Sequence, residues 1–282
     1  MTDVLVVGAG PAGATAARSL AVRGVRVQVL ERATFPRSKP CGGGITIRAL
    51  ARFPWLAPAL HRIATHLVSR LHLEGPGGSH VVIESASPAV LLVRRIEFDH
   101  LLVRLAAESG AEIYEGACVS ALSIDEDGVT ARTRDGRAFR GRHLVAADGV
   151  NGVVTRRLGM HPGWDASSLA LDMMEEAPNE SLRAVEPGTL WVTYGHGGSD
   201  GYGYIFPKRD HVNVGIGCLL SHFRQREAIP PYELQRSFVE TLKARGLLDG
   251  SSCRDRFTPC HIPVGGPSTK TARGRVLVAG DA

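Results

Sequence analysis

Apolar positions near the start of the chain follow the pattern of a strand, a helix and a second strand. Val4–Val7 is a short continuous apolar run, which is typical of a parallel strand that is covered on both faces. A glycine-rich turn comes next, and the alanine-rich segment Ala14–Ala21 favours a helix that ends at Gly24. Val25–Leu30 is the next apolar run. The start of the chain therefore predicts a βαβ unit.

Farther along, short alternating runs indicate a second kind of sheet. Leu67–Leu73 and His80–Glu84 flank the turn Gly75–Gly78, which favours antiparallel pairing. Phe98–Ser109 carries apolar residues on one face and predicts an amphipathic helix. Further strands are expected at Ala89–Val93, Ala111–Tyr114, Cys118–Ile124, His143–Ala147, Leu190–Tyr194, Tyr202–Phe206, Val212–Leu219 and Arg275–Ala279.

This order of elements predicts an α/β fold with two domains. The first is a Rossmann-like nucleotide-binding domain with a parallel sheet, and the second is a substrate domain built on a largely antiparallel sheet. We expect the first domain to be discontinuous, with residues 1–66, 94–164 and 266–282. The substrate domain would take residues 67–93 and 165–265.

Composition narrows the class of protein. The 282 residues are 44% hydrophobic, so the chain can bury a large core, and its formal charge of +5 is spread along the sequence. No uninterrupted apolar stretch reaches the ~18 residues that a spanning helix needs, and the first residues lack the basic region of a signal peptide. We expect a cytoplasmic protein that does not bind nucleic acid; the oligomeric state stays open.

The cysteines predict neither a disulfide framework nor a metal site. Their number is odd, they are widely spaced, and no C-x-x-C pair occurs. Cys260 is followed by a histidine, but no second pair of ligands accompanies these neighbours. We expect no bound metal.

A dinucleotide fingerprint lies in the first turn. In Gly8-x-Gly10-x-x-Gly13, the first glycine allows a tight turn and the second lets the backbone approach a pyrophosphate. The third allows close packing of the helix, whose N-terminus attracts the phosphate charge. Glu31 ends the second strand, where a carboxylate accepts hydrogen bonds from ribose hydroxyls. Because a strand precedes the motif and a helix follows it, a bound dinucleotide is favoured over a structural turn.

Two later motifs identify the dinucleotide through a resemblance. Asp148-Gly149 and Gly280-Asp281 each end an apolar strand. They resemble the motifs of flavoproteins built on the para-hydroxybenzoate hydroxylase plan, in which the late aspartate approaches the ribityl chain of the flavin. The resemblance implies that the cofactor is FAD. A plain turn is the alternative interpretation of Asp148-Gly149.

The middle of the chain resembles the geranylgeranyl reductase family, which uses FAD to saturate the double bonds of polyprenyl chains. The resemblance spans essentially the whole chain and rests on Pro40–Gly44, Arg95–Asp99, Gly201–Lys208 and Asn213–Gly217. It implies that Arg95 reaches the flavin and that Val119 packs near the adenine. Members often have Trp where this chain has Tyr204, which adds a hydroxyl to the aromatic surface.

Taken together, these motifs predict the cofactor-binding residues. They are Gly8, Gly10, Pro11, Ala12, Gly13, Glu31, Arg32, Cys41, Gly42, Gly43, Gly44, Arg95, Val119, Asp148, Gly280 and Asp281.

Each residue of the middle motifs also has a structural interpretation. Gly42, Gly43 and Gly44 are either a flexible loop or a backbone that lies flat against a planar ring. Cys41 is either an inert small residue or a proton donor beside the ring. Tyr202 and Tyr204 face the same side of a strand, as core aromatics or as the lining of an apolar slot. The candidate catalytic acids, in order of preference, are Tyr204, Tyr202 and Cys41. Asp172, Glu175 and Glu176 have helical spacing, which predicts a solvated face, and receive no role.

The expected activity is hydride transfer from reduced FAD to a carbon–carbon double bond of a polyprenyl (geranylgeranyl) chain, with a proton added to the neighbouring carbon. No second G-x-G-x-x-G occurs, so NADPH or a reduced redox protein would be an external donor. The lipid substrate implies peripheral contact with the inner face of a membrane.

Two alternatives stay open: an FAD-dependent monooxygenase of an aromatic or quinone-like substrate, and a non-catalytic flavin-binding protein. Members of the resembled family continue past Gly280-Asp281, where this chain stops. We therefore expect a C-terminally truncated fragment that binds FAD weakly.

Overall fold

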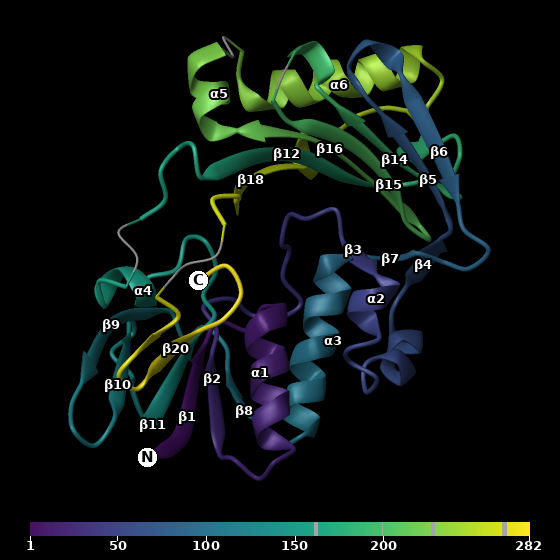
Figure 1. Ribbon diagram of the computed structural model, residues 1–282. Coiled ribbons are helices and arrows are strands. Elements are labelled where there is room, and N and C mark those ends of the chain that lie inside the picture. The colour runs from purple at the N-terminus through teal and green to yellow at the C-terminus, as the bar shows by residue number, and fades with distance from the viewer. Residues whose placement is uncertain (161–162, 199, 227–228, 267–269) are drawn as a thin grey trace. The chain divides into compact units, whose positions relative to one another are not determined.

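The computed structural model describes residues 1–282 apart from 161–162, 199, 227–228 and 267–269. Contacts divide the chain into two units, each assembled from separate stretches of sequence (Figure 1). Unit 1 contains Met1–Ser38, Ile96–Trp164 and Gly266–Ala282, and unit 2 contains Lys39–Arg95 and Asp165–Gly265. The division places residues 39–66 and 94–95 in unit 2, whereas they were predicted to belong to the first domain. What each unit binds stays a prediction at this level.

A parallel sheet forms the centre of unit 1. β1 (Thr2–Val7) pairs in parallel with β2 (Val27–Leu30) on one side and with β11 (Ala138–Ala146) on the other. β8 (Glu112–Tyr114) extends the parallel sheet beyond β2, and β20 (Val276–Val278) extends it beyond β11. Antiparallel partners complete it: β9 (Val119–Ile124), β10 (Val129–Thr133) and β19 (Ala272–Arg273).

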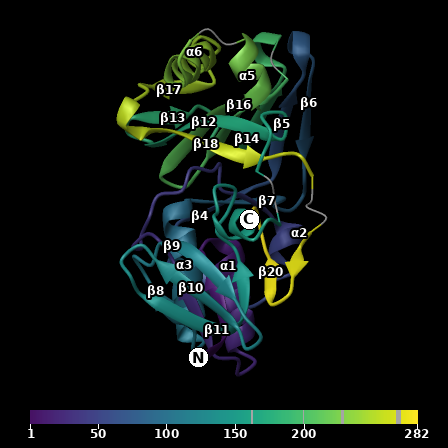
Figure 2. The same cartoon turned by 90° about the vertical axis from the view of Figure 1, so that its left-hand side faces the viewer.

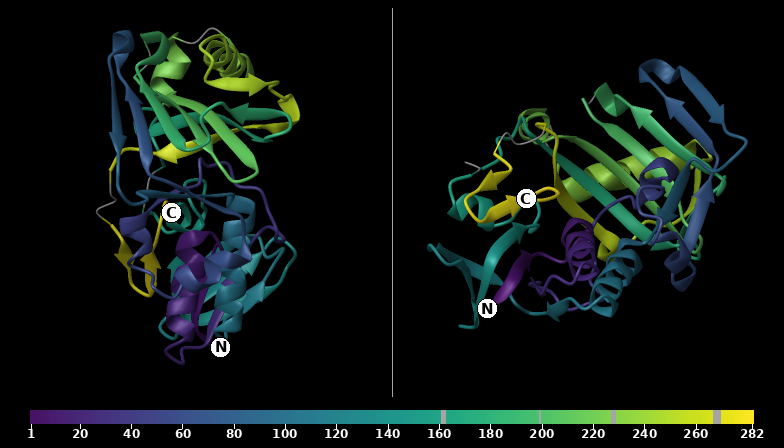
Figure 3. Two further views of the ribbon diagram at one scale, coloured as in Figure 1. Left: turned by 90° about the vertical axis from the view of Figure 1, so that its right-hand side faces the viewer. Right: turned by 60° about the horizontal axis from the view of Figure 1, so that its bottom comes forward.

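Helices α1 (Pro11–Ala21) and α3 (Arg95–Glu108) lie side by side along this sheet (Figures 1 and 3). α1 forms because five alanines favour helix and a proline occupies its first position. Its buried face consists of Gly13, Ala14 and Ala17, small residues that let the helix approach β1 and β2. The short α4 (Val154–Arg157) follows β11.

The larger sheet of unit 2 is mostly antiparallel, with the strand order β18-β12-β16-β15-β14-β5-β6 in the described residues. Only β14 and β5 pair in parallel there. Its strands are β5 (Arg70–Glu74), β6 (His80–Glu84), β12 (Leu169–Pro178), β14 (Thr189–Tyr194), β15 (Tyr202–Pro207), β16 (His211–Leu219) and β18 (Phe257–Pro263).

Helices α5 (Leu220–Arg226) and α6 (Pro231–Ala244) cover one face of this sheet (Figure 2). On that face Phe238 of α6 packs so closely on Gly203 that a Cβ at residue 203 would lie 2.3 Å from the ring. Side chains alternate along a strand, so Tyr202, Tyr204 and Phe206 point to the opposite face. The aromatic part of the candidate site lies on that face.

Smaller elements complete unit 2. A separate antiparallel sheet has the order β3-β7-β4, and β13 pairs with β17. The remaining elements are β3 (Gly44–Thr46), α2 (Ile47–Leu50), η1 (Ala57–Arg62), β4 (Thr65–Val68), η2 (Pro76–Gly78), β7 (Val90–Val93), β13 (Leu182–Ala184), η3 (His196–Gly198), β17 (Leu248–Gly250) and η4 (Arg254–Arg256).

The predicted fold class is confirmed: a parallel Rossmann-like sheet accompanies a largely antiparallel one. One local prediction is wrong. Asp172, Glu175 and Glu176 belong to β12, not to a helix, and Asp172 and Glu175 are buried. Among the described residues, no helix combines the length and the apolar character needed to cross a membrane.

Candidate functional site

The turn between β1 and α1 has the geometry of a phosphate cradle. Gly8 has a φ of +97°, and a Cβ there would lie 2.3 Å from the Ala147 carbonyl oxygen. A Cβ on Gly13 would lie 1.9 Å from the Gly8 carbonyl oxygen, so only glycine lets α1 pack here. A Cβ on Gly10 would meet only the Arg37 guanidinium, at 3.8 Å. The turn is therefore crowded at its first and third glycines and open at the second, as the binding of a pyrophosphate requires.

Glu31 closes the cradle from the end of β2. Its side chain is buried, with Oε2 accepting a hydrogen bond from the Ala9 amide at 2.8 Å and Oε1 accepting one from the Ala33 amide at 3.0 Å. The carboxylate thus holds the glycine turn in place. Its predicted contact with ribose hydroxyls stays a prediction.

Arg37, a residue that the sequence analysis did not single out, lies beside the open glycine. Its guanidinium is 3.1 Å from the Asp99 carboxylate and 3.8 Å from that of Glu31, and it stacks over the Phe35 ring at 4.9 Å. These contacts hold a cation next to Gly10, where an anionic diphosphate fits. No motif marks this arginine, because its position depends on the long-range contact with Asp99.

The predicted motif Asp148-Gly149 has a structural role in unit 1. Asp148 Oδ2 accepts hydrogen bonds from the amides of Val153, at 2.5 Å, and Val154, at 3.1 Å, at the start of α4. Its Oδ1 atom is buried and has no hydrogen-bond partner among the described residues. A carboxylate oxygen that is buried and still free to accept fits a hydroxyl-bearing ligand such as a ribityl chain. The cofactor contact itself stays a prediction.

Gly280, near the end of the chain, reaches the start of α1. A Cβ there would lie 2.8 Å from that of Ala12, and the residue has a φ of +70°. The structure thus brings Gly280 close to Ala12, in the first turn of the helix. Of the other residues predicted in unit 1, Arg32 is exposed, whereas Val119 is buried in the core with Leu5 and Leu30.

In unit 2 the segment Pro40–Gly44 packs against the aromatic face of the larger sheet. A Cβ on Gly42 would lie 2.7 Å from the Phe206 ring, and one on Gly43 would lie 2.1 Å from the Val93 carbonyl oxygen. Asn213 Nδ2 donates to the Cys41 carbonyl at 3.3 Å. The glycines are therefore required by close packing, and the flexible-loop interpretation is not needed. Arg95, also assigned to unit 2, is the first residue of α3.

Three aromatic rings line this face in a row. The centroids of Tyr202 and Tyr204 are 5.8 Å apart, and those of Tyr204 and Phe206 are 4.7 Å apart. The neighbouring strand offers glycine opposite two of them, because Gly215 pairs with Tyr204 and Gly217 with Tyr202. The Tyr204 ring is buried among Val68, Leu92, Leu190 and Val192. Tyr202 is 40% exposed, so the row has one accessible end.

Asp172 faces this row from β12, although its sequence spacing predicted a solvated face. The Tyr204 hydroxyl donates to Asp172 Oδ2 at 3.2 Å, with Oδ1 at 3.5 Å. Burial raises the pKa of Asp172 to about 6, and burial also raises the pKa of Tyr204 well above its ordinary value. The clue was the apolar context of Leu169–Ala177, which suits a strand better than a solvated helix.

A second polar group lies farther along the same face. Lys208 is buried and pairs with Glu176, which also lies 3.8 Å from Arg94 Nε. Burial lowers the pKa of Lys208, while the charge of Glu176 opposes that shift. A Cβ on Gly43 would lie 3.1 Å from Lys208 Nζ, so this pair supports the Pro40–Gly44 segment.

Cys260, on β18, lies close to Asp172. Its Sγ atom lies 3.9 Å from Asp172 Oδ2 and 3.9 Å from the Pro40 carbonyl oxygen. Burial raises the pKa of Cys260 to about 11, so the thiol is neutral near pH 7. In the described part of the chain, no group of three metal-ligating side chains occurs.

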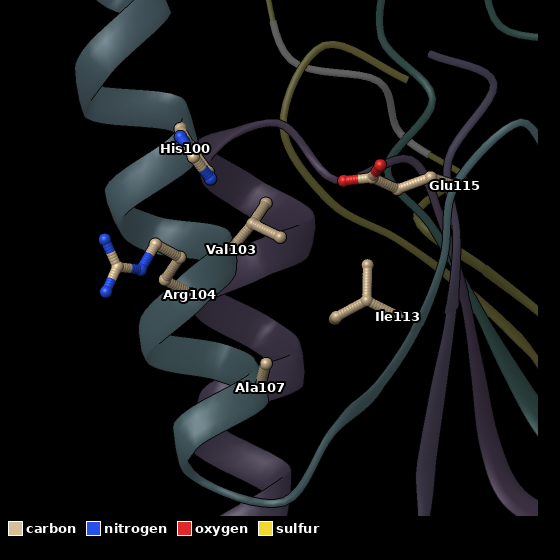
Figure 4. Close-up of a pocket in the computed structure, with 6 residues that line it drawn as sticks. All are labelled: His100, Val103, Arg104, Ala107, Ile113 and Glu115. Atoms are coloured by element: carbon tan, nitrogen blue, oxygen red, sulfur yellow. The ribbon is translucent and has the colours of Figure 1, made fainter. Parts of the chain in front are cut away.

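A cavity of about 350 Å³ lies elsewhere, between α3 and β8 in unit 1 (Figure 4). It is lined by His100, Val103, Arg104, Ala107, Ile113 and Glu115. None of these residues was predicted from the sequence.

Comparison with known proteins assigns this chain to a family. A model described as an FAD binding domain matches residues 1–282. The chain belongs to this family. The glycine cradle, the Arg37 cation and the free Asp148 oxygen fit FAD. A halogenase solved in complex with phloroglucinol and FAD shares the fold, with a TM-score of 0.76 at 15% identity. The match covers 98% of this chain and 63% of the halogenase chain.

Relatives of this chain include two enzymes that are named as reductases. Digeranylgeranylglycerophospholipid reductase 2 of Methanopyrus kandleri is 31% identical over 99% of this chain and 70% of its own length. A menaquinone reductase of Mycobacterium tuberculosis is 34% identical with the same coverage. The predicted family resemblance is therefore confirmed.

A solved structure agrees in fold. A geranylgeranyl bacteriochlorophyll reductase-like protein from Thermoplasma acidophilum superposes with a TM-score of 0.84 at 21% identity, over 98% of this chain and 70% of its own. The chain spans only 53% of an uncharacterized Methanosarcina barkeri protein to which it is 30% identical.

Proposed function

We propose that this chain belongs to a reductase that saturates carbon–carbon double bonds in a polyprenyl chain. The observation that carries the proposal is the row Tyr202-Tyr204-Phe206, which is aromatic along its length and is hydrogen-bonded to one buried acid, Asp172. Isoprene units offer no hydrogen-bonding groups, so apolar contact and shape must bind them. The relatives named for geranylgeranyl lipids and menaquinone, whose molecules carry polyprenyl chains, support this substrate class.

The residues of the chain divide the work of such a reaction. FAD, when bound and reduced, supplies a hydride to one alkene carbon and is thereby oxidised by two electrons. Tyr204 is our first candidate for the proton that the neighbouring carbon needs, with Tyr202 and Cys41 next. The aromatic rings and the packed Pro40–Gly44 segment exclude water, which strengthens hydrogen bonds at the site.

The proposal also implies an electron donor and a location in the cell. We propose NADPH or a reduced redox protein as the external donor. A substrate with a polyprenyl tail resides in a bilayer, so we propose a cytoplasmic enzyme that contacts the inner membrane face peripherally.

The test uses purified full-length protein loaded with FAD and reduced by dithionite under anaerobic conditions. Menaquinone with a polyprenyl tail and a geranylgeranyl glycerophospholipid are the probes. Flavin reoxidation without oxygen, together with a lipid product heavier by two hydrogens for each bond reduced, supports the reductase. Reoxidation that needs oxygen and yields a hydroxylated product contradicts it.

A monooxygenase is the second candidate. A rifampicin monooxygenase of Streptomyces venezuelae is 33% identical over 66% of this chain, although the match covers 40% of that enzyme. The oxygen-dependent outcome above is the result that this candidate predicts.

A further inference from the structure

Tyr204 is held in one orientation by its surroundings. Its side chain is 2% exposed, and a Cβ on Gly215 would lie 2.3 Å from its oxygen, so the ring lies flat across the neighbouring strand. The Phe206 ring packs against it at 4.7 Å. This orientation aims the hydroxyl at the carboxylate of Asp172.

The groups facing Asp172 come from each neighbouring element. β15 contributes Tyr204 and, nearby, Tyr202; β18 contributes Cys260 at 3.9 Å. From β16 comes Gly217, which has no side chain, and a Cβ there would lie 3.4 Å from Asp172 Oδ1. Lys39 lies in the loop before Cys41, and its charge lowers the pKa of Asp172. This effect is smaller than that of burial, which raises the pKa. Asp172 forms no ion pair with another described residue.

We infer that Asp172 is the proton reserve of the site and that it acts through Tyr204. The inference rests on the proposed alkene reduction. As the alkene carbon gains its proton, the Tyr204 O–H bond breaks and a C–H bond forms. In the same step the Asp172 O–H bond breaks and the Tyr204 O–H bond re-forms. Asp172 is left as a carboxylate, which takes its next proton from solvent.

The phenol alone is a poor donor in this position. Giving up its proton would leave a tyrosinate in a buried, apolar site beside a second acid, and burial raises the pKa of Tyr204 far above its ordinary range. The carboxyl group is the stronger acid of the two, because its pKa of about 6 lies within reach of neutral pH. A relay through the two groups avoids the tyrosinate.

The first experiment needs neither substrate nor activity. Infrared difference spectra across pH should show a protonated carboxyl band that disappears with a midpoint near pH 6, and Asp172→Asn should remove that band. Cys260→Ser is the matched control, since it also changes a neighbour 3.9 Å from Asp172 yet keeps the acid. A wild-type spectrum without such a band, or one that Asp172→Asn leaves unchanged, overturns the inference.

The second experiment measures the rate of lipid reduction against pH with menaquinone as the probe. The wild-type rate should fall about tenfold per pH unit above pH 6, as the reserve loses its proton. Asp172→Asn and Tyr204→Phe should lower the rate at pH 6 by about 100-fold and flatten this profile, while Cys260→Ser should keep its midpoint. A sloping profile in Asp172→Asn overturns the relay. If neither the wild type nor any variant reduces the lipid while the infrared band behaves as expected, the reductase proposal fails. The assignment of Asp172 as a buried, protonated acid is then still supported.

Discussion

Gly215 lies directly beneath Tyr204: a Cβ at residue 215 would be 2.3 Å from the phenolic oxygen and 2.6 Å from Cε1. The glycine therefore sets the height at which the ring crosses β16, and with it the reach of the hydroxyl to Asp172. An aromatic row of this kind needs a smooth strand beside it, which the glycines of β16 provide.

Gly215→Ala should force the ring off its position. We expect a loss of about 1–3 kcal/mol in the free energy of unfolding, because the surrounding core cannot make room for a methyl group without strain. Urea unfolding measures the loss. Gly188→Ala is the control, since a Cβ at residue 188 would meet nothing within 4 Å. Equal stability of the two variants would contradict the role given to Gly215.

Asp172→Asn should change the dependence of stability on pH. The pKa of Asp172 rises from 3.8 to about 6 on folding, so the folded protein holds this proton more tightly than the unfolded chain does. The wild type then loses stability as pH rises from 3.8 to about 6, by at most about 3 kcal/mol. Asparagine keeps an acceptor for Tyr204 without the charge, so the variant should be more stable than the wild type above pH 6 and gain nothing below pH 4. Thermal unfolding across this range measures the difference; parallel curves would contradict it.

Gly10→Ala and Gly13→Ala should separate binding from folding. A Cβ on Gly10 meets only the guanidinium of Arg37, so this variant should fold normally while its methyl group occupies the space where a pyrophosphate approaches. We expect FAD affinity to fall at least about tenfold, equivalent to about 1.4 kcal/mol. Gly13→Ala should instead lower the unfolding temperature, because its Cβ would overlap the Gly8 carbonyl. Quenching of FAD fluorescence measures the affinity, and circular dichroism measures the unfolding temperature. Unchanged FAD affinity in Gly10→Ala would contradict a role of this turn in binding FAD.

Lys208→Met should destabilise unit 2 by about 2–4 kcal/mol, because it leaves the Glu176 carboxylate without its nearest cation. Adding Glu176→Leu should restore most of the loss, since an apolar pair can replace an ion pair of similar volume. The surface pair of Lys243 and Glu240 provides the control, and Lys243→Met should cost less than about 1 kcal/mol. Urea unfolding of all four proteins measures these values. A double variant as unstable as Lys208→Met alone would contradict a role based on charge.

The parts of the site that the sequence predicted are those whose chemistry is local. Gly8, Gly10 and Gly13 lie within six consecutive positions of one turn, and their roles follow from the strand before them and the helix after them. Glu31 was predicted for the same reason, since the end of a parallel strand next to that turn is its neighbour. Asp172 and Arg37 were not predicted, because their partners Tyr204 and Asp99 lie far away in sequence.

Hydrophobic periodicity predicted the fold class and backbone freedom predicted the glycines of the first turn, because both are properties of short segments. The FAD-binding family was predicted from the resemblance of the later motifs to known flavoproteins. The three-dimensional fold was needed to show that three acids with helical spacing belong to a strand and that one of them, Asp172, contacts Tyr204. Strand registers bring these residues together across β16, and burial then shifts the pKa of the acid. Both depend on what surrounds a side chain in space, which a single sequence does not state.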